Sequence, residues 1–232
     1  IVGLSQYRTP WPSWQDGLPF DNKETVSLFA NSLHVPSWRT LLLPDELATQ
    51  TDVEEALTLW LPKRVTKDSI VFFYFAGHAR ADTKTGEVFL MPYDSTPQSS
   101  PFRLISLRFL QHRLLKLGAK LAVAIIEAPV DEMGVAAKNN TRRRATPNWI
   151  GDLGGSSNIG TGAIIQVSRR SPPSQGRQNL LNGLTGQADR DNNGIVTLGE
   201  WLRSLRSIAV TVPTLPPDLA VQSIPLSHVN QP

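Results

Sequence analysis

Apolar residues in this chain gather in short runs, and the longest of these runs do not alternate with polar residues. Residues 70–76 are apolar at every position, and residues 121–126 repeat that pattern. Such runs are typical of strands that are buried on both faces of a sheet. Shorter apolar runs predict further strands at residues 1–4, 40–43, 88–91 and 163–167.

Stretches with helical spacing of apolar residues separate these strands. They predict helices over residues 21–33, 51–61, 107–117 and 198–208, and a shorter helix over 179–187. Asp21 and the box from Thr51 to Glu54 would cap the first two helices, and Gly118 would end the third. Residues 79–86 read as a polar loop. Strands that alternate with helices predict an α/β fold in three layers, with a mostly parallel sheet between helices, as a single domain over residues 1–232.

The composition excludes several classes of function. A net charge of +3 over 232 residues gives no argument for nucleic-acid binding. The chain has 0 cysteines, which excludes disulfides, thiolate metal sites and a cysteine nucleophile. No apolar run is long enough to predict a membrane span. The start, Ile1-Val2-Gly3-Leu4, has neither Met nor a basic leader, so we expect an excised domain whose first strand lacks its beginning. The compartment stays unknown, with the cytoplasm as the default.

His78 is the first candidate for chemistry, because it directly follows the buried run and Gly77. Ligands of parallel α/β sheets bind just beyond the carboxyl ends of the strands. The alternative is an ordinary histidine at the end of a strand. We expect the other histidines, His34, His112 and His228, to be surface residues.

Four motifs occur in an order that points to a known family. They are VGLSQY at 2–7, FYFAGH at 73–78, FLMPYD at 89–94, and GLTGQAD at 183–189 continuing to Glu200. Over nearly its whole length the chain resembles a caspase-like domain (clan CD, peptidase C14 type) of the bacterial metacaspase or orthocaspase group. The resemblance implies the caspase-like three-layer sandwich.

The resemblance also implies where the catalytic dyad of a cysteine-type endopeptidase would lie. His78 matches the family histidine, followed by Ala79 where the family usually has glycine. Glu127 falls on the aspartate of the family's DxC signature, and Pro129 falls on its cysteine. Proline carries no nucleophile, so the resemblance implies a fold that is kept and a proteolytic reaction that is lost.

We therefore expect a pseudopeptidase that binds a peptide or protein, or that regulates an active caspase-like relative. One alternative is an endopeptidase with basic P1 specificity, either engineered to lose its cysteine or using another group such as Asp131 or Ser168. Several departures from the motif around Pro129 favour natural decay over an engineered change. Another alternative is a structural module of a larger protein.

Glu127 and a basic segment are the residues that bear on which peptides the domain would bind or present. In family members that cleave after basic residues, the aspartate of DxC helps to form an acidic pocket, so Glu127 would bind a basic side chain of a peptide. The alternative is a carboxylate that pairs with a nearby arginine. Residues 131–160 resemble the family's activation linker and carry Arg142, Arg143 and Arg144, which could equally be a solvated charge run.

Residues 189–200 match the pattern of a calcium-binding EF-hand loop. Calcium prefers hard oxygen ligands at fixed loop positions, and Gly194 would allow the sharp turn. The alternative is a turn that only caps the last helix. The predicted ligands are Asp189, Asp191, Asn193, the Ile195 carbonyl, Thr197 and Glu200.

Overall fold

The computed structural model describes residues 1–8, 22–82, 84–96, 98–128, 130–132, 161–167, 182–206 and 225–228. Pro129, Ser168 and residues 133–160, which include Arg142, Arg143 and Arg144, lie outside the described residues. The predictions made for these positions are therefore not tested by the fold.

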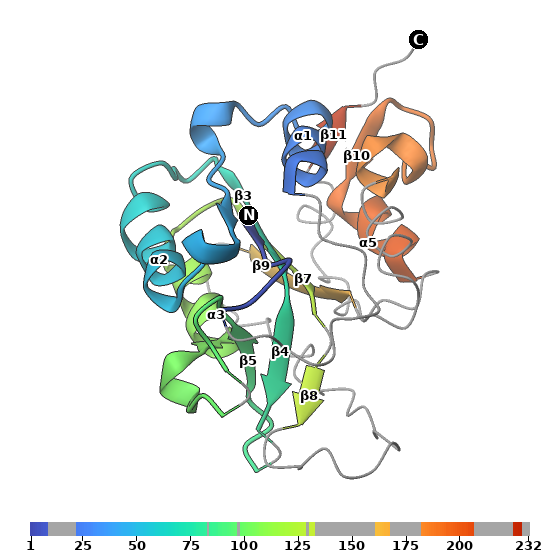
Figure 1. Cartoon of the computed structure of the whole chain (residues 1–232). Coiled ribbons are helices and arrows are strands. Elements are labelled where there is room, and N and C mark those ends of the chain that lie inside the picture. The colour runs from blue at the N-terminus through green and yellow to red at the C-terminus, as the bar shows by residue number, and fades with distance from the viewer. Residues whose placement is uncertain are drawn as a thin grey trace.

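A parallel sheet forms the centre of the molecule (Figure 1). Its strand order is β2-β1-β3-β7-β9, and every neighbouring pair is parallel. The predicted α/β class with a mostly parallel sheet is confirmed. The strands are β1 (Val2–Gly3), β2 (Leu43–Pro44), β3 (Ile70–Ala76), β7 (Leu121–Glu127) and β9 (Thr161–Val167).

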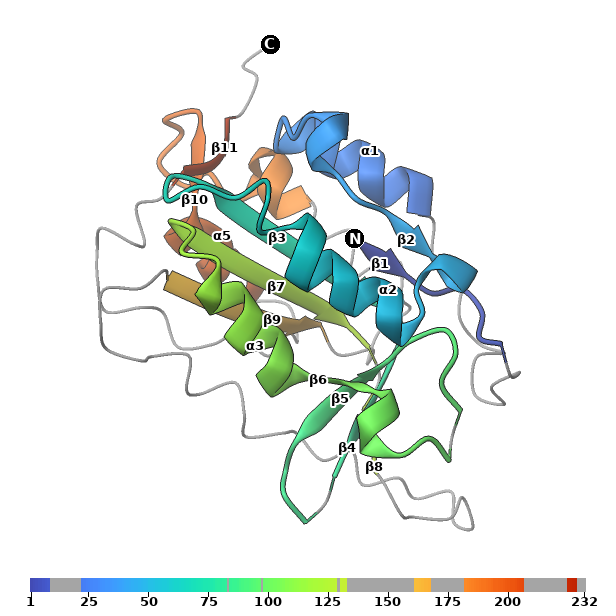
Figure 2. The same ribbon diagram turned by 90° about the vertical axis from the view of Figure 1, so that its left-hand side faces the viewer.

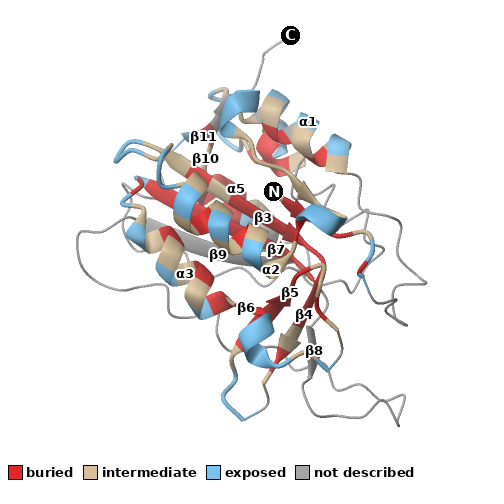
Figure 3. Ribbon diagram, turned by 60° about the vertical axis from the view of Figure 1, so that its left-hand side comes forward, coloured by how far each residue is buried: buried red, intermediate tan, exposed pale blue. Residues whose placement is uncertain are grey.

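Helices cover both faces of this sheet, because β3 and β7 are apolar on both faces. On one face, α2 (Gln50–Glu55), its π-helical continuation η3 (Ala56–Trp60) and α3 (Leu107–Lys116) pack against odd-numbered residues of β3 such as Phe73 and Phe75. On the other face, α1 (Asn22–Ser32) and α5 (Leu198–Arg206) pack against Tyr74 and neighbouring residues of β7. Figure 2 shows α2 and α3 on the near side of β3 and β7, and Figure 3 shows that both strands are largely buried.

A second sheet continues from the carboxyl end of β3. Its order is β6-β5-β4-β8, with β4 (His78–Ala81), β5 (Val88–Met91), β6 (Ile105–Ser106) and β8 (Val130–Glu132). The prediction of a polar loop from residue 79 was therefore wrong for its first part. Ala79 and Ala81 are buried, and Ala79 to Ala81 pair antiparallel with Leu90 to Val88. Small residues made this strand hard to recognise, because neither alternation nor β-branching marks it.

Two further predictions need correction. Helix α2 is capped by Thr49 with Asp52, not by the box from Thr51 to Glu54, so the helix begins earlier than predicted. The strand predicted at 40–43 has sheet pairing at Leu43–Pro44, and a 3-10 turn at Ser37–Arg39 precedes the predicted strand.

The remaining elements are short. They are the 3-10 turns η1 (Ser37–Arg39), η2 (Asp45–Leu47) and η4 (Pro101–Arg103), the π-helical η6 (Gly183–Gln187), and the antiparallel pair β10 (Ile195–Thr197) and β11 (Pro225–His228). In the part of the chain that the structure describes, no helix has the length and apolar character needed to cross a membrane.

Candidate functional site

The carboxyl ends of β3 and β7 meet at one edge of the central sheet. Ala76 is the register partner of Glu127, the last residue of β7. The backbone N–H of Gly77 then donates a hydrogen bond of 3.0 Å to the Glu127 carbonyl. The structure therefore brings the backbone that carries His78 and the backbone that carries Glu127 to the same edge.

His78 is a buried residue that Tyr7 holds in place. Its relative exposure is 2%, and its backbone N–H donates to the Tyr7 hydroxyl oxygen at 2.7 Å. The two rings lie 5.6 Å apart between centroids, tilted by 52°. The Tyr7 hydroxyl donates in turn to the Met91 carbonyl of β5, at 3.3 Å. A residue on the loop after β1 thus links the first residue of β4 to the end of β5.

Gly77 occupies a position with no room for a side chain. A Cβ atom there would lie 2.9 Å from two ring carbons of Phe75 and 3.0 Å from the Tyr7 hydroxyl. The glycine lets the chain leave β3 and enter β4 while Tyr7 approaches the backbone closely. This packing is what fixes the position of His78 relative to β3.

Glu127 is a buried acidic residue whose side chain meets a tyrosine. Its relative exposure is 2%, and its Oε2 accepts a short hydrogen bond from the Tyr74 hydroxyl. Tyr74 also packs edge-on against Phe29 of α1, with ring centroids 5.9 Å apart. This hydrogen-bond partner is a neutral phenol. Pairing of Glu127 with an arginine, the alternative considered from the sequence, stays a prediction.

The segment after β7 runs toward the start of β4. Ala128 is fully buried, and Val130 of β8 is the register partner of Ala79. Asp131, one of the alternative nucleophiles considered from the sequence, is the register partner of Arg80. Pro129 itself is outside the described residues, but its two neighbours belong to the same edge of the molecule as His78.

The predicted calcium loop brings three carboxyl groups together. Oxygen atoms of Asp189, Asp191 and Glu200 all lie within 4.8 Å of one another. Asp189 accepts hydrogen bonds from the backbone of Asn193 and Gly194, at 3.2 Å and 2.9 Å. Hard carboxylate oxygens this close together fit a divalent cation such as calcium. Occupation of the loop by calcium stays a prediction.

The same loop also caps helix α5, as the alternative reading of the sequence proposed. Thr197 N–H donates to Glu200 Oε2 at 2.9 Å, and Glu200 N–H donates back to Thr197 Oγ1 at 3.3 Å. This reciprocal pair is a capping box. Burial raises the pKa of the Glu200 carboxyl. Hydrogen bonds from the Thr197 N–H, the Thr197 hydroxyl and the Arg190 N–H lower this pKa by more than burial raises it, so it lies below its usual value.

Sequence reasoning missed the two tyrosines of the site. Tyr74 lies inside the unbroken apolar run of β3, where nothing in the pattern sets it apart. Tyr7 had a signal, since it closes the VGLSQY motif, but its role depends on contacts with residues 70 and more positions away. Of the histidines expected at the surface, His34 and His112 are exposed, and nothing is described of the His228 side chain.

Comparison with known proteins gives a likeness in fold. No protein-family model matches the chain, and no curated protein matches it. Among solved structures, the chain is similar to protein GSU0716 from Geobacter sulfurreducens, with a TM-score of 0.55 and 14% sequence identity. The match covers 99% of this chain and 97% of that protein. At this identity the likeness supports the α/β fold over the length of the chain and carries no function.

Proposed function

We propose that this chain is a non-catalytic, peptidase-like binding domain that recognises a basic side chain of a peptide or protein at the carboxyl ends of β3 and β7. The proposal combines the motif resemblance to caspase-like domains with the chemistry of the residues at this edge. A domain of this kind would bind its partner, or regulate an active relative, without cleaving it.

The Glu127–Tyr74 pair is the observation that carries the proposal. A buried carboxylate is costly unless hydrogen bonds and an opposite charge compensate it. Tyr74 supplies a hydrogen bond to Glu127 but no positive charge. An arginine or lysine side chain of a ligand would supply that charge. Glu127 is almost fully buried, so the proposal requires a conformation in which this edge opens to the ligand.

The residue types support binding rather than hydrolysis. Covalent peptide cleavage by this family's mechanism needs a thiolate, and the chain has 0 cysteines. His78 remains at the edge, packed against Tyr7. A histidine without the nucleophile can position a peptide by hydrogen bonding but cannot form an acyl-enzyme.

Calorimetric titration with matched peptides tests the recognition. One peptide ends in arginine, and its control ends in citrulline, which has nearly the same shape without the charge. We expect the arginine peptide to bind at least about tenfold more tightly, a difference of ~1.4 kcal/mol. Glu127→Gln should abolish the preference, whereas Glu55→Gln, a change at an exposed position of α2, should keep it. Equal affinity for both peptides would refute recognition of charge.

A peptidase assay separates this proposal from the enzymatic alternative. The wild-type chain and His78→Ala are incubated with fluorogenic substrates that end in arginine or lysine, with and without calcium. We expect no turnover above background from either protein. Hydrolysis by the wild type that disappears in His78→Ala would establish an enzyme and overturn the non-catalytic assignment.

A further inference from the structure

The outer faces of two neighbouring helices carry opposite charges. Residues 50–60, which form α2 and η3, include three acidic residues and no basic one, and α3 includes three basic residues and no acidic one. These helices cover the same face of the central sheet, and η3 contacts α3. Figure 2 shows α2 and α3 side by side. The acidic residues are Asp52, Glu54 and Glu55, and the basic residues are Arg108, Arg113 and Lys116.

The exposed residues of each helix lie in one stripe, on the side opposite its buried residues. Residues four apart in a helix lie on the same face. Val53 and Leu57 are buried on the sheet side of α2 and η3, and Leu110 and Leu114 are buried on the sheet side of α3. Figure 3 shows exposed residues on the outer sides of both helices. The exposed stripes are Thr51, Glu55 and Leu59 on α2 and η3, and Arg108, His112 and Lys116 on α3.

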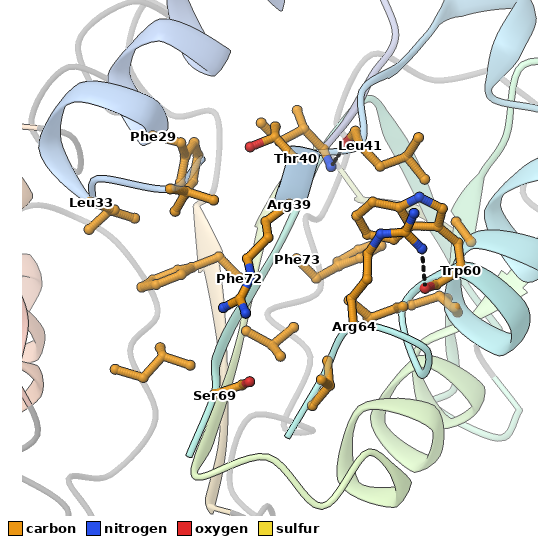
Figure 4. Close-up of a pocket in the computed structure, with 18 of the residues that line it drawn as sticks. Phe29, Leu33, Arg39, Thr40, Leu41, Trp60, Arg64, Ser69, Phe72 and Phe73 are labelled. Atoms are coloured by element: carbon orange, nitrogen blue, oxygen red, sulfur yellow. Dashed lines mark hydrogen bonds between the residues drawn. The ribbon is translucent and has the colours of Figure 1, made fainter. Parts of the chain in front are cut away.

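Basic residues of the same chain do not neutralise the acidic stripe. No basic residue occurs from residue 40 to residue 62. Arg64, which follows η3, donates from Nη1 to the Trp60 carbonyl at 3.1 Å and lies over the Trp60 ring at 4.3 Å, as Figure 4 shows. Its guanidinium group is therefore held at the end of η3. Among the described residues, the side chains of Glu55, Arg108 and Lys116 have no ion-pair partner.

Exposed apolar side chains gather around the acidic helix. In the part of the chain that the structure describes, the large apolar side chains that are exposed are Trp38, Leu47, Leu59 and Phe102. Leu59 belongs to the acidic stripe, and Leu47 lies three residues before α2. Phe102, with 90% exposure, lies beside the start of α2, because its carbonyl accepts a hydrogen bond of 3.0 Å from Gln50 Nε2. Such gathering is typical of a surface that binds another protein.

We propose that this face forms the interface of a homodimer, in which α2 and η3 of each copy pack against α3 of the other. A second copy provides the complementary charge, since its basic stripe is the counterpart of the acidic stripe. A twofold dimer makes each contact twice, so both acidic stripes meet a basic stripe. Exposed ion pairs contribute little individually. The apolar side chains beside α2 therefore supply most of the affinity, and the charges select the partner and its orientation.

The direction of the two helices allows such a dimer. Helix α2 precedes β3 and helix α3 precedes β7, and these strands are parallel, so the two helices run in the same direction. A twofold axis that runs along the outer face, between the two helices and parallel to them, places α2 of each copy over α3 of the other. Glu127 lies at the carboxyl ends of the strands rather than on this face, so the dimer does not depend on the ligand proposed there.

Sedimentation equilibrium of the wild-type chain tests for the dimer. We expect mostly monomer at about 1 µM and mostly dimer at about 500 µM, so both stripes are solvated in dilute solution. Association should be weaker in about 0.5 M NaCl than in about 0.05 M NaCl, because salt screens the charges. A chain that stays monomeric up to about 1 mM would overturn the proposal. Equal association at the two salt concentrations would contradict pairing by charge.

Charge reversal identifies the helices that pair. One variant carries Arg108→Glu and Lys116→Glu on α3, and a second carries Glu55→Lys on α2, all at exposed positions. Each variant alone should dimerise at least about tenfold more weakly than the wild type, because like charges then meet at both contacts. An equimolar mixture of the two variants should associate about as tightly as the wild type, because the acidic α3 of the first meets the lysine-bearing α2 of the second. A mixture that associates no more tightly than each variant alone would refute this pairing.

Two further variants serve as controls for the dimer. Lys84→Glu reverses an exposed charge between β4 and β5, away from both helices, and should dimerise as the wild type does. If it weakens the dimer as much as the α3 variant does, the effect comes from net charge and the assigned interface is wrong. Glu127→Gln should leave the dimer unchanged, so failure of the dimer and failure of the Glu127 site are distinguishable.

Discussion

The hydroxyl oxygen of Tyr7 accepts a hydrogen bond from the backbone N–H of His78 at 2.7 Å. The same hydroxyl donates to the Met91 carbonyl, so one phenol satisfies two main-chain groups of adjacent strands in the second sheet. These groups are buried together with His78. The position of the candidate site therefore depends on a residue near the start of the chain.

We expect Tyr7→Phe to lower the free energy of unfolding by about 1–3 kcal/mol, because a buried N–H and a buried carbonyl lose their partner. Urea denaturation followed by tryptophan fluorescence measures this change. Tyr93→Phe is the matched control at a half-buried tyrosine, and we expect a change within about 0.5 kcal/mol there. Similar losses in the two variants would show that the Tyr7 hydrogen bonds contribute nothing particular.

Gly77→Ala should destabilise the fold through a steric clash. The added methyl group would lie 2.9 Å from ring carbons of Phe75, a fully buried side chain that has little room to move. Overpacking of this kind costs about 1–3 kcal/mol in unfolding free energy.

A double-mutant cycle with Phe75→Leu identifies the clash as the cause. Because leucine removes the ring carbons that meet the new methyl group, we expect the double variant to lose less stability than the two single losses added together. Strict additivity would contradict the clash with Phe75.

The two central strands of the sheet could be predicted because burial on both faces requires an unbroken run of apolar residues. The runs that became β3 and β7 are apolar at nearly every position, and their predicted bounds agree with the structure to within one residue. Helix α3 was predicted equally well from the spacing of its apolar residues and from Gly118, which follows it in a left-handed conformation with φ of 64°. The bounds of each of these elements follow from residues within the element or directly next to it.

The features that sequence reasoning missed depend on contacts between distant residues. Tyr74 looked like any other apolar residue of β3, yet its hydroxyl meets Glu127, 53 positions later. Strand β4 was missed because His78 to Ala81 has no strand pattern, and its pairing with β5 decides its structure.

Calcium should raise the melting temperature of the wild-type chain if the loop of residues 189–200 binds it as its composition predicts. A ligand that binds only the folded state stabilises it by about 2.7 kcal/mol at a concentration of 100 Kd. Asp191→Asn should remove most of the shift, because it replaces an exposed carboxylate of the cluster and leaves the Thr197–Glu200 capping box intact. Differential scanning calorimetry in chelator and in millimolar calcium measures the effect.

The control for the calcium experiment is Asp68→Asn, an exposed aspartate outside the loop, which should keep the full shift. An unchanged midpoint in the wild type across millimolar calcium would contradict calcium binding. The loop would then serve only to cap α5.

Glu200 should make the stability of the chain depend on pH in the acidic range. Burial and the nearby charge of Asp189 raise the pKa of its carboxyl in the folded state, but hydrogen bonds from Thr197 and Arg190 outweigh both effects, so the pKa is lowered. The fold therefore favours the ionised form, relative to an ordinary glutamate with a pKa of about 4.3. This contribution to stability is complete above about pH 4.3 and is lost as the pH falls through the lowered pKa of the folded state.

We expect Glu200→Gln to be less stable than the wild type at pH 7, and we expect the difference to shrink below pH 4, as measured by urea denaturation across pH. Glu55→Gln, at an exposed position, should show no such convergence with the wild type, and a Glu200→Gln difference that stays constant down to acid pH would contradict the role given to these hydrogen bonds.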